Sequence, residues 1–271
     1  MLLAQITDLH IKPRGRLAYR KVDTAQCLET AVQALLAVSP VPDMVLVTGD
    51  LVDAGRPEEY GLLREILSPI RQPLFLMPGN HDARAPLRAG FPDHRYLGMD
   101  GHIQYAIEEF PLRILALDSL VDGQGGGRLG AAQLDWLDLR LAEQRDRPTV
   151  VAVHHPPFTT RIGHMDKIGL EDAAGFAAVI GRHPQVERVL SGHLHRAIQT
   201  RFAGTLASTA PSTAHSVALD LRPDAPSAFS LEPPGYQLHW YEPAAGLISH
   251  TAAIGDWPGP FPFFENGVLI D

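Results

Sequence analysis

The chain of 271 residues offers little for disulfide chemistry or for membrane insertion. Its single cysteine, Cys27, excludes an intrachain disulfide, which is typical of proteins from a reducing compartment. No apolar run is long enough to span a bilayer, and the first residues, LLAQIT, enter an apolar strand without a basic leader. We therefore expect a cytoplasmic protein with no membrane partner.

Positive charge is also scarce. The 23 Lys and Arg residues stand against 31 Asp and Glu residues, which gives a net charge of −8. Surfaces that bind nucleic acid are usually basic, so we expect no long nucleic acid as a partner. A pocket for an anion must then obtain its positive charge locally, from an arginine, a lysine or a bound metal.

Short apolar runs rich in Val, Ile and Leu alternate with segments of helical period. The predicted strands are 2–7, 44–48, 74–77, 113–117, 149–153 and 188–190. The predicted helices are 22–38, 57–67, 131–143 and 171–182. This alternation favours an α/β fold in which helices cover a sheet whose strands are buried on both faces.

The composition changes after about residue 205, where Pro and Gly become frequent. Residues 235–254 predict a β-hairpin that turns around Glu242–Gly246. The last stretch, WPGPFPFFENGVLI, is rich in aromatic residues and proline and is not expected to form a helix. We therefore predict a main domain over residues 1–204 and a β-rich cap with a C-terminal tail over residues 205–271.

Polar side chains follow five of the predicted strands. These residues are Asp8 and His10, Asp50, Asn80 and His81, His154 and His155, and His193 and His195. Ligands of an open α/β sheet bind beyond the carboxyl ends of its strands, so these groups are expected to converge. Residues two apart, such as Asp8 and His10, point the same way in an extended chain. Of the adjacent His154 and His155, only one is expected to face a shared site.

The converging set mixes carboxylates with imidazoles, which suits Zn, Mn or Fe better than Ca or Mg. The set expected at one place has seven groups, which is more than one tetrahedral site can take: Asp8, His10, Asp50, Asn80, one of His154 and His155, His193 and His195. They fit two metals that lie about 3.5–4 Å apart and share a bridging carboxylate. A single histidine at a strand end is usually a solvated or capping residue, but five such signals at successive strand ends argue against that interpretation for the set.

The order of these motifs, D-x-H, G-D, G-N-H-D, H-H-P and G-H-x-H, resembles the calcineurin-like metallophosphoesterases. The segments ITDLH, GDLVDAGRPEEY, PGNHD, HHPP and SGHLH are similar to the bacterial branch that contains class III cyclic-nucleotide phosphodiesterases and promiscuous glycerophosphodiesterases. The resemblance implies a four-layer α/β/β/α sandwich with a small β-rich C-terminal cap, in place of one simple sheet.

The resemblance also implies the ligands of two divalent metal ions. One ion is held by Asp8, His10 and His195, the other by Asn80, His154 and His193, and Asp50 bridges them. Ligand type narrows the ions to Fe, Mn, Zn or Co. Because the amide of Asn80 is neutral, we expect its metal to be bound more weakly than the other and to be lost first.

The implied activity is hydrolysis of small phosphodiesters, either glycerophosphodiesters or 3′,5′-cyclic nucleotides, by attack of a metal-bound hydroxide. Besides Asp50, the implied catalytic residues are His81, which orients the phosphate or protonates the leaving group, and His215. The alternative for His215 is a surface histidine on the cap. Arg56 either contacts the substrate or begins a helix, and His164 lies in a loop that can border the pocket.

Three alternatives differ from this hypothesis. A phosphomonoesterase or a nuclease of the same superfamily shares the motifs, whereas a non-catalytic scaffold would have lost ligands. Protein phosphatases of the superfamily typically carry G-D-x-x-D-R-G and G-N-H-E, but GDLVDAGR lacks the arginine directly after Asp53. Because every ligand position is filled, we expect an enzyme, a metal-dependent phosphoric diester hydrolase.

The aromatic residues of the last segment predict an interface. Trp240, Trp257, Phe261, Phe263 and Phe264 supply more apolar surface than a small β-rich region can bury alone. Relatives with this resemblance pair through the same region. We therefore expect a homodimer or a higher homo-oligomer.

Overall fold

The computed structural model describes residues 1–270 of the chain. The helices are α1 (Thr24–Leu36), α2 (Pro57–Leu67), α3 (Arg84–Gly90), the 3-10 helix η1 (Arg95–Leu97), α4 (Gly130–Glu143), α5 (Gly163–Asp166) and α6 (Ala173–Ile180). The strands of the body are β1 (Leu2–Ile6), β2 (Met44–Thr48), β3 (Leu74–Met77), β4 (Tyr105–Ile107), β5 (Arg113–Leu117), β6 (Thr149–Val153), β7 (Val186–Ser191), β8 (Ile198–Phe202), β9 (Thr205–Thr209), β12 (Gly235–Glu242) and β13 (Gly246–Ala253). Four shorter strands follow the same numbering: β10 (Ser216–Val217), β11 (Phe229–Ser230), β14 (Phe264–Glu265) and β15 (Val268–Leu269). All predicted strands and helices are present, with ends that differ by no more than two residues.

Two mixed sheets form the body. The first has the strand order β13-β12-β1-β2-β3, in which β1, β2 and β3 run parallel and β12 joins β1 antiparallel. The second has the order β4-β5-β6-β7-β9-β8, with parallel inner strands and antiparallel partners at its two edges. The inner strands β1, β2, β5 and β6 are buried along their whole length, as expected for strands covered on both faces.

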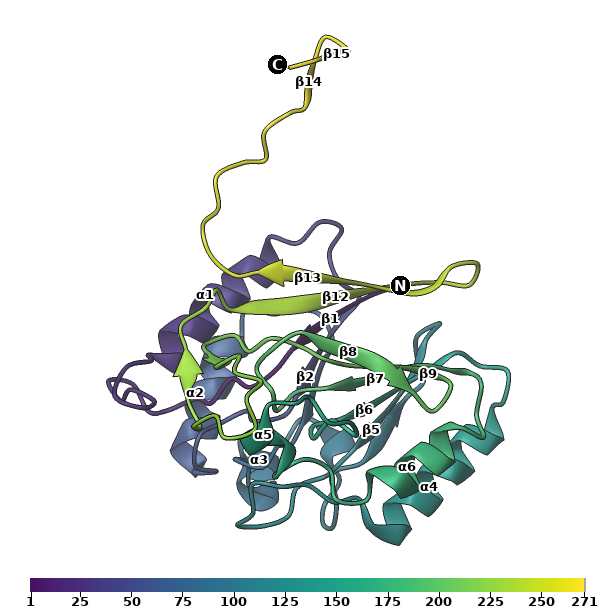
Figure 1. The fold of residues 1–271 in the computed structure, drawn as a ribbon. Helices are drawn as coiled ribbons and strands as arrows, with labels where there is room; N and C mark the ends of the chain where they lie inside the picture. The colour runs from purple at the N-terminus through teal and green to yellow at the C-terminus, as the bar shows by residue number, and fades with distance from the viewer. Residues whose placement is uncertain (271) are drawn as a thin grey trace.

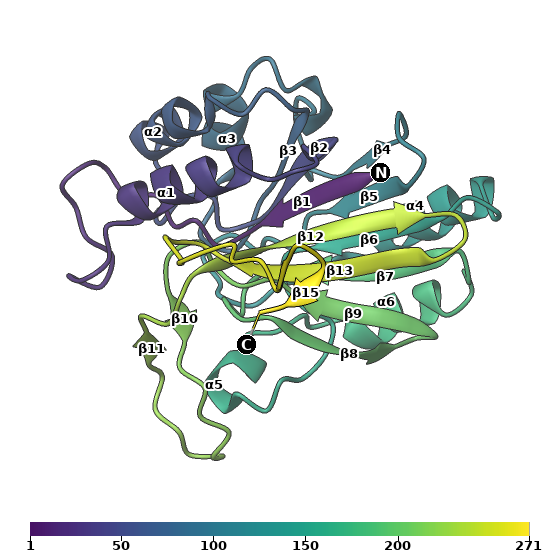
Figure 2. The same ribbon diagram turned by 90° about the horizontal axis from the view of Figure 1, so that it is seen from above.

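The two sheets pack against each other with helices outside them (Figures 1 and 2). Leu3 and Leu46 of the first sheet share one core cluster with Ile114 and Val150 of the second. Helices α1 to α3 pack on the first sheet, and α4 and α6 pack on the second. This confirms the four-layer α/β/β/α arrangement and corrects the reading of the alternating pattern as a single sheet.

Two of the helices on the first sheet, α1 and α2, begin at residues that suit the first turn of a helix. The Asp23 carboxylate accepts a hydrogen bond from the Gln26 backbone N–H at 3.1 Å and so begins α1. Helix α2 begins with Pro57, which lacks the N–H that a first helical turn leaves unpaired. The starts of α1 and α2 are therefore set by local sequence, and they lie within two residues of the predicted ones.

Segment 205–271 contributes to both sheets. Strand β9 lies within the second sheet and the hairpin β12–β13 completes the first, so the predicted boundary at residue 205 runs through the second sheet. The reason is strand pairing between distant segments, which composition does not reveal. The ladder β10–β11 and the arm over residues 255–270, which ends in β14–β15, stand outside the two sheets (Figure 1).

Among residues 1–270, no helix combines the length and the apolar character needed to cross a membrane.

Candidate metal centre

The polar motifs lie where β1, β2, β3, β6 and β7 end, and the two packed sheets bring these ends together. Their side chains are buried except for those of Asn80 and His81, which are half-buried. The predicted set that converges is Asp8, His10, Asp50, Asn80, His154, His193 and His195. The site is therefore shared by both sheets and does not belong to the edge of one.

Five of these residues have a left-handed backbone, which is uncommon for residues other than glycine. They are Asp8 (φ 53°), His10 (φ 46°), Asp50 (φ 49°), His193 (φ 70°) and His195 (φ 53°). Asp8 and His10 do lie in one site, but the prediction that an extended backbone points them the same way is wrong. Their conformation is held by hydrogen bonds from Asp8 N to Gly49 O (3.0 Å) and from His10 N to Asp50 O (2.9 Å). Strained backbone of this kind concentrates at functional sites.

The glycines of the G-D and G-N motifs leave room for the site. A Cβ on Gly79 would lie 2.2 Å from Oδ1 of Asp50, and a Cβ on Gly49 would lie 2.3 Å from Nδ1 of His154. No real Cβ contact is this short, so any other residue would displace these side chains. The glycines are thus part of the site because they permit the close approach of its polar groups.

One half of the site is built by Asp8, His10 and His195. Nε2 of His10 lies 3.1 Å from Nε2 of His195, and the latter atom lies 3.4 Å from Oδ1 of Asp8. On the other side of its ring, Nδ1 of His195 lies 3.1 Å from the carbonyl oxygen of His215. Because a carbonyl only accepts, Nδ1 donates there and Nε2 keeps its lone pair for the site.

The other half is built by Asn80, His154 and His193. The amide oxygen Oδ1 of Asn80 lies 3.2 Å from Nε2 of His154 and 3.0 Å from Nδ1 of His193. His154 donates from Nδ1 to the carbonyl of Thr48 at 2.9 Å, so its Nε2 is the nitrogen that faces the site. Burial lowers the pKa of His154, but the charge of Asp50 outweighs burial and raises the pKa to about 9. Asn80 is therefore placed to offer a neutral oxygen next to two imidazole nitrogens.

Asp50 lies between the two halves. Its Oδ2 is 3.5 Å from Nε2 of His10, and its Oδ1 is 3.4 Å from Nε2 of His154. Burial opposes its charge, but the neighbouring histidines, His154 above all, outweigh burial and hold the pKa of Asp50 well below its usual range. One ionised carboxylate thus presents an oxygen to each half of the site.

At the centre, nitrogen and oxygen atoms of the predicted ligands lie close together, and two of the imidazoles are neutral. Burial lowers the pKa of His10 and of His193 well below 6.5, so both rings are neutral. Ligand atoms that lie about 2.0–2.2 Å from one ion, at tetrahedral or octahedral angles, are about 2.8–3.6 Å from each other. The distances of 3.0–3.5 Å found here match that spacing, so the residues fit bound divalent cations.

Two neighbouring residues support the site from outside. His155 places Nδ1 2.8 Å from Oγ of Ser119 and Nε2 3.1 Å from the carbonyl of Gly125, so it holds the adjacent loop. Its ring atoms nevertheless lie within 4.8 Å of those of His154 and His193. Asp82 accepts hydrogen bonds from the backbone N–H of Leu51, that of Gly79 and the hydroxyl of Tyr60, and thereby fixes the turn that carries Asn80.

A cavity of about 410 Å³ opens onto the centre. His81 and His215 line it, and their rings lie 4.6 Å and 5.7 Å from the His10 ring. His215 is buried, so it is not the surface histidine that was the alternative. Arg56 is exposed at the start of α2 and does not line this cavity. Of its two predicted roles, the structure fits that of a residue that begins the helix.

The two histidines of the cavity differ in protonation. Burial lowers the pKa of His81, but Asp50 and Asp53 outweigh it, so that the pKa is raised above 6.5. Burial and the neighbouring His195 lower the pKa of His215 to about 3. His81 can therefore carry a proton near neutral pH, whereas His215 is neutral there.

Four residues that shape the cavity belong to no motif, and the sequence did not identify them individually: Tyr19, Met165, Ile168 and Phe229. The Tyr19 ring lies 5.2 Å from that of His215 and 4.9 Å from that of Phe229. An aromatic residue in a loop gives no signal by itself. The left-handed backbone of Tyr19 (φ 49°), visible only in the structure, marks it.

The chain matches known proteins along its length. The family model for calcineurin-like phosphoesterases matches residues 1–197. A probable glycerophosphodiester phosphodiesterase of Arcobacter nitrofigilis is 39% identical over 273 residues, covering 100% of both chains. A probable cyclic nucleotide phosphodiesterase of Rhodopseudomonas palustris is 35% identical and covers 100% of this chain and 98% of its own.

The fold also matches a solved structure. A dimetal phosphatase from Danio rerio aligns with a TM-score of 0.62 over 94% of this chain and 99% of its own, at 16% identity. This likeness concerns the fold alone, while the family match includes the motifs whose side chains form the cluster able to bind metal. The chain belongs to the calcineurin-like phosphoesterase family.

Proposed function

We propose that this protein hydrolyses small phosphodiesters at a centre of two divalent metal ions. In this proposal Asp8, His10 and His195 hold one ion, Asn80, His154 and His193 hold the other, and Asp50 bridges them. The observation that carries it is the position of Asp50, with one carboxylate oxygen toward each group of ligands. The metals are Fe, Mn, Zn or Co, since the nitrogen and oxygen ligands suit any of these.

The substrates we propose are glycerophosphodiesters or 3′,5′-cyclic nucleotides, the classes named for the relatives. Among the described residues, no Lys or Arg lines the cavity. Positive charge for a phosphate therefore comes from the metals and from His81. A diester with one negative charge suits such a pocket better than a monoester with two, and the acidic chain disfavours a long nucleic acid.

When bound, the cations lower the pKa of a water molecule and offset the charge of the phosphoryl oxygens. The chain contributes the groups around them. The carbonyl of Asp53 accepts from Nδ1 of His81 at 2.8 Å, which leaves Nε2 of His81 for the substrate. With its raised pKa, His81 is suited to protonate the leaving oxygen. The neutral His215 is suited to orient the phosphate by hydrogen bonding instead.

The test compares bis(p-nitrophenyl) phosphate with p-nitrophenyl phosphate on the Mn²⁺-loaded protein, with the metal content measured on the same sample. Two metals per chain and a preference for the diester support the proposal. A preference for the monoester would show a phosphomonoesterase on the same centre. A protein that stays inert after loading would favour the scaffold, and the Asp50→Asn variant is the negative control.

We further propose that residues 1–204 supply the metal ligands, and that segment 205–271 adds His215 to the cavity and supplies a dimerisation region. Trp257, Phe261 and Phe263 of the arm are 58%, 74% and 78% exposed, which is unusual for large apolar side chains and suits a contact with a second copy. Strand β13 is an edge strand beside the arm and has unpaired backbone groups on its outer side. The location proposed for the protein is the cytoplasm, in keeping with the free Cys27.

A further inference from the structure

We propose that His164 on α5 is a specificity-determining residue that hydrogen-bonds a hydroxyl on the part of the diester that is not released. This role rests on the proposed phosphodiester hydrolysis. The group that the enzyme retains after cleavage is then a neutral alkyl group that carries hydroxyls.

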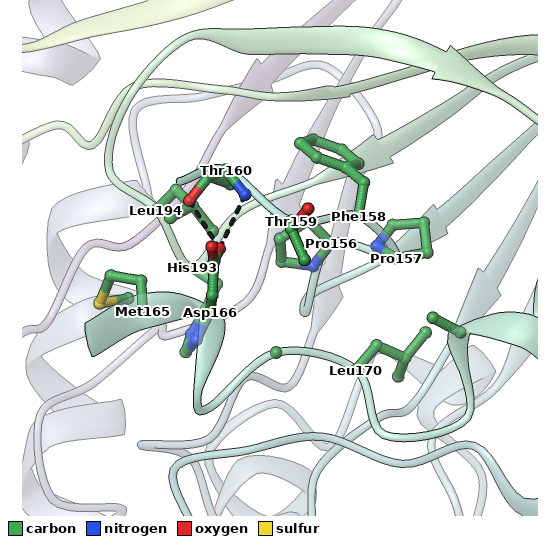
Figure 3. Close-up of a pocket in the computed structure, with 12 residues that line it drawn as sticks. Pro156, Pro157, Phe158, Thr159, Thr160, Met165, Asp166, Leu170, His193 and Leu194 are labelled. Atoms are coloured by element: carbon green, nitrogen blue, oxygen red, sulfur yellow. Dashed lines mark hydrogen bonds between the residues drawn. The ribbon is translucent and has the colours of Figure 1, made fainter. Parts of the chain in front are cut away.

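The cavity has two sides. His81 and His215 lie on the side of the first metal site, with ring distances of 4.6 Å from His81 to His10 and 4.5 Å from His215 to His195. Helix α5 lies beside the second metal site, since Met165 lines a second cavity of about 120 Å³ together with His193 (Figure 3), and Met165 also packs near Val217.

This division separates the two ester arms of a substrate. If the leaving oxygen faces His81, the second ester group of a phosphodiester extends toward α5. That group meets His164, Met165 and Ile168, which line the main cavity there. A monoester has no second group and would leave this side empty.

The polar group on this side is the imidazole of His164. The residue is half-buried and lines the cavity, and its Nδ1 is buried without a hydrogen-bond partner among residues 1–270. Buried polar atoms are nearly always paired, so an unpaired one beside a binding cavity points to a partner from outside the chain. A hydroxyl both donates and accepts, so it can pair with either tautomer of the ring. The apolar Met165 and Ile168 suit the carbon chain that carries the hydroxyl.

Helix α5 is held in place by Asp166. Its Oδ1 accepts hydrogen bonds from the backbone N–H of Thr160 at 2.7 Å and from Oγ1 of Thr160 at 2.9 Å (Figure 3). Its Oδ2 accepts from the N–H of Arg161 at 3.0 Å, and Arg161 has a left-handed backbone (φ 69°). A single helical turn is not stable by itself, so these bonds fix where His164 stands. Asp166 is therefore a positioning residue for His164.

Two synthetic diesters test the role of His164. Both release p-nitrophenol, but one retains a methyl group and the other a glyceryl group with two hydroxyls. His164→Ala is expected to lower kcat/KM about tenfold for the glyceryl ester and to change it less than about twofold for the methyl ester, as expected for one lost hydrogen bond. His164→Gln, which can still hydrogen-bond, is expected to recover part of the loss. His250→Ala, an exposed histidine on β13, is the matched control.

Asp166→Ala is expected to produce the same selective loss, because it releases α5 without touching the metal ligands. Metal content is expected to stay normal in every variant. An equal loss on both esters, or no loss on the glyceryl ester, overturns the role of His164 while the proposed function stands. A metal-loaded wild type that hydrolyses neither ester overturns the proposed function, and the role of His164 with it.

Discussion

Nε2 of His10 lies 3.1 Å from Nε2 of His195, although 185 residues separate the two along the chain. His195 donates from its other nitrogen to the carbonyl of His215, so a lone pair of His195 faces His10. Asp50 adds an oxygen 3.5 Å from the same His10 nitrogen. Buried acceptors this close repel each other unless a cation lies between them. Replacing one of them is therefore expected to change the metal content.

The first prediction concerns Asp50. Asp50→Asn removes the charge that faces both halves of the site, so metal content is expected to fall at both. The loss of activity is expected to exceed about 100-fold, the upper value for groups outside the ligand sphere. Metal analysis by mass spectrometry after dialysis checks it, with Asp100→Asn, at an exposed position, as control. If Asp50→Asn retained two metals per chain, Asp50 would not be the bridging ligand.

The second prediction concerns Asn80, whose neutral oxygen lies between two imidazoles. Titration with a chelator is expected to release the metals in two phases, the Asn80 ion first. Asn80→Asp adds a charge and is expected to bring the two phases together by tightening the weaker site. Equal release of both ions from the wild type, or no tightening in the variant, would contradict this ranking.

The third prediction concerns His81. His81→Ala is expected to lower kcat while metal content stays normal, because the ring lines the cavity, its Nδ1 is held by the carbonyl of Asp53, and it is not one of the proposed ligands. For an alkyl leaving group, which needs a proton, we expect a loss of about 100-fold or more. For p-nitrophenol, which leaves as an anion, the loss is expected to be much smaller. A parallel loss of metal would make His81 a ligand or a structural support.

The fourth prediction concerns pH and a histidine outside the metal centre. His239 is buried between the sheets, with Nε2 3.0 Å from Oε1 of Gln5 and Nδ1 2.6 Å from Oγ of Ser249. Burial, helped by the charge of Arg188, lowers its pKa from 6.5 to about 3. As pH falls, His239 therefore takes up a proton at a higher pH in the unfolded chain than in the folded one. The stability that neutral His239 contributes is complete above pH 6.5 and is lost between 6.5 and about 3.

Urea unfolding of the metal-free protein at pH 7 and pH 5 measures this effect. From the pKa change, His239 alone is expected to account for a loss of about 2 kcal/mol between these values. His239→Gln is expected to remove that share of the pH dependence, and His250→Gln, exposed on the neighbouring strand, is expected to keep it. The same slope in wild type and His239→Gln would show that His239 is not the source.

The fifth prediction concerns the arm. A chain that ends at Ile254 keeps both sheets intact and loses the exposed aromatic residues that follow. It is expected to be a monomer in light scattering at micromolar concentration, whereas the full chain is a dimer or larger. A full chain that scatters as a 29.5 kDa monomer would rule out pairing through the arm.

The short elements around the cavity could not be predicted from the sequence. Helix α5 has four residues and no stripe of apolar side chains, so it gives no periodic signal. Tyr19 and Phe229 lie far apart in the chain and meet only because β11 pairs with β10 near the cavity. No local pattern encodes such contacts, so the sequence indicated that the loop of His164 can border the cavity but did not identify the other residues of its walls.

The sequence by itself determined the strands, the larger helices and the polar residues that follow the strands. The reason is that hydrophobic periodicity and helix capping depend on residues close together in the chain. Only the tertiary structure decided that the strands divide into two sheets, since the same alternation fits one. It also decided that Asp8 and His10 meet His193 and His195 through left-handed turns, and that β12 pairs with β1. These outcomes depend on contacts between distant segments, whose free energy no local pattern contains.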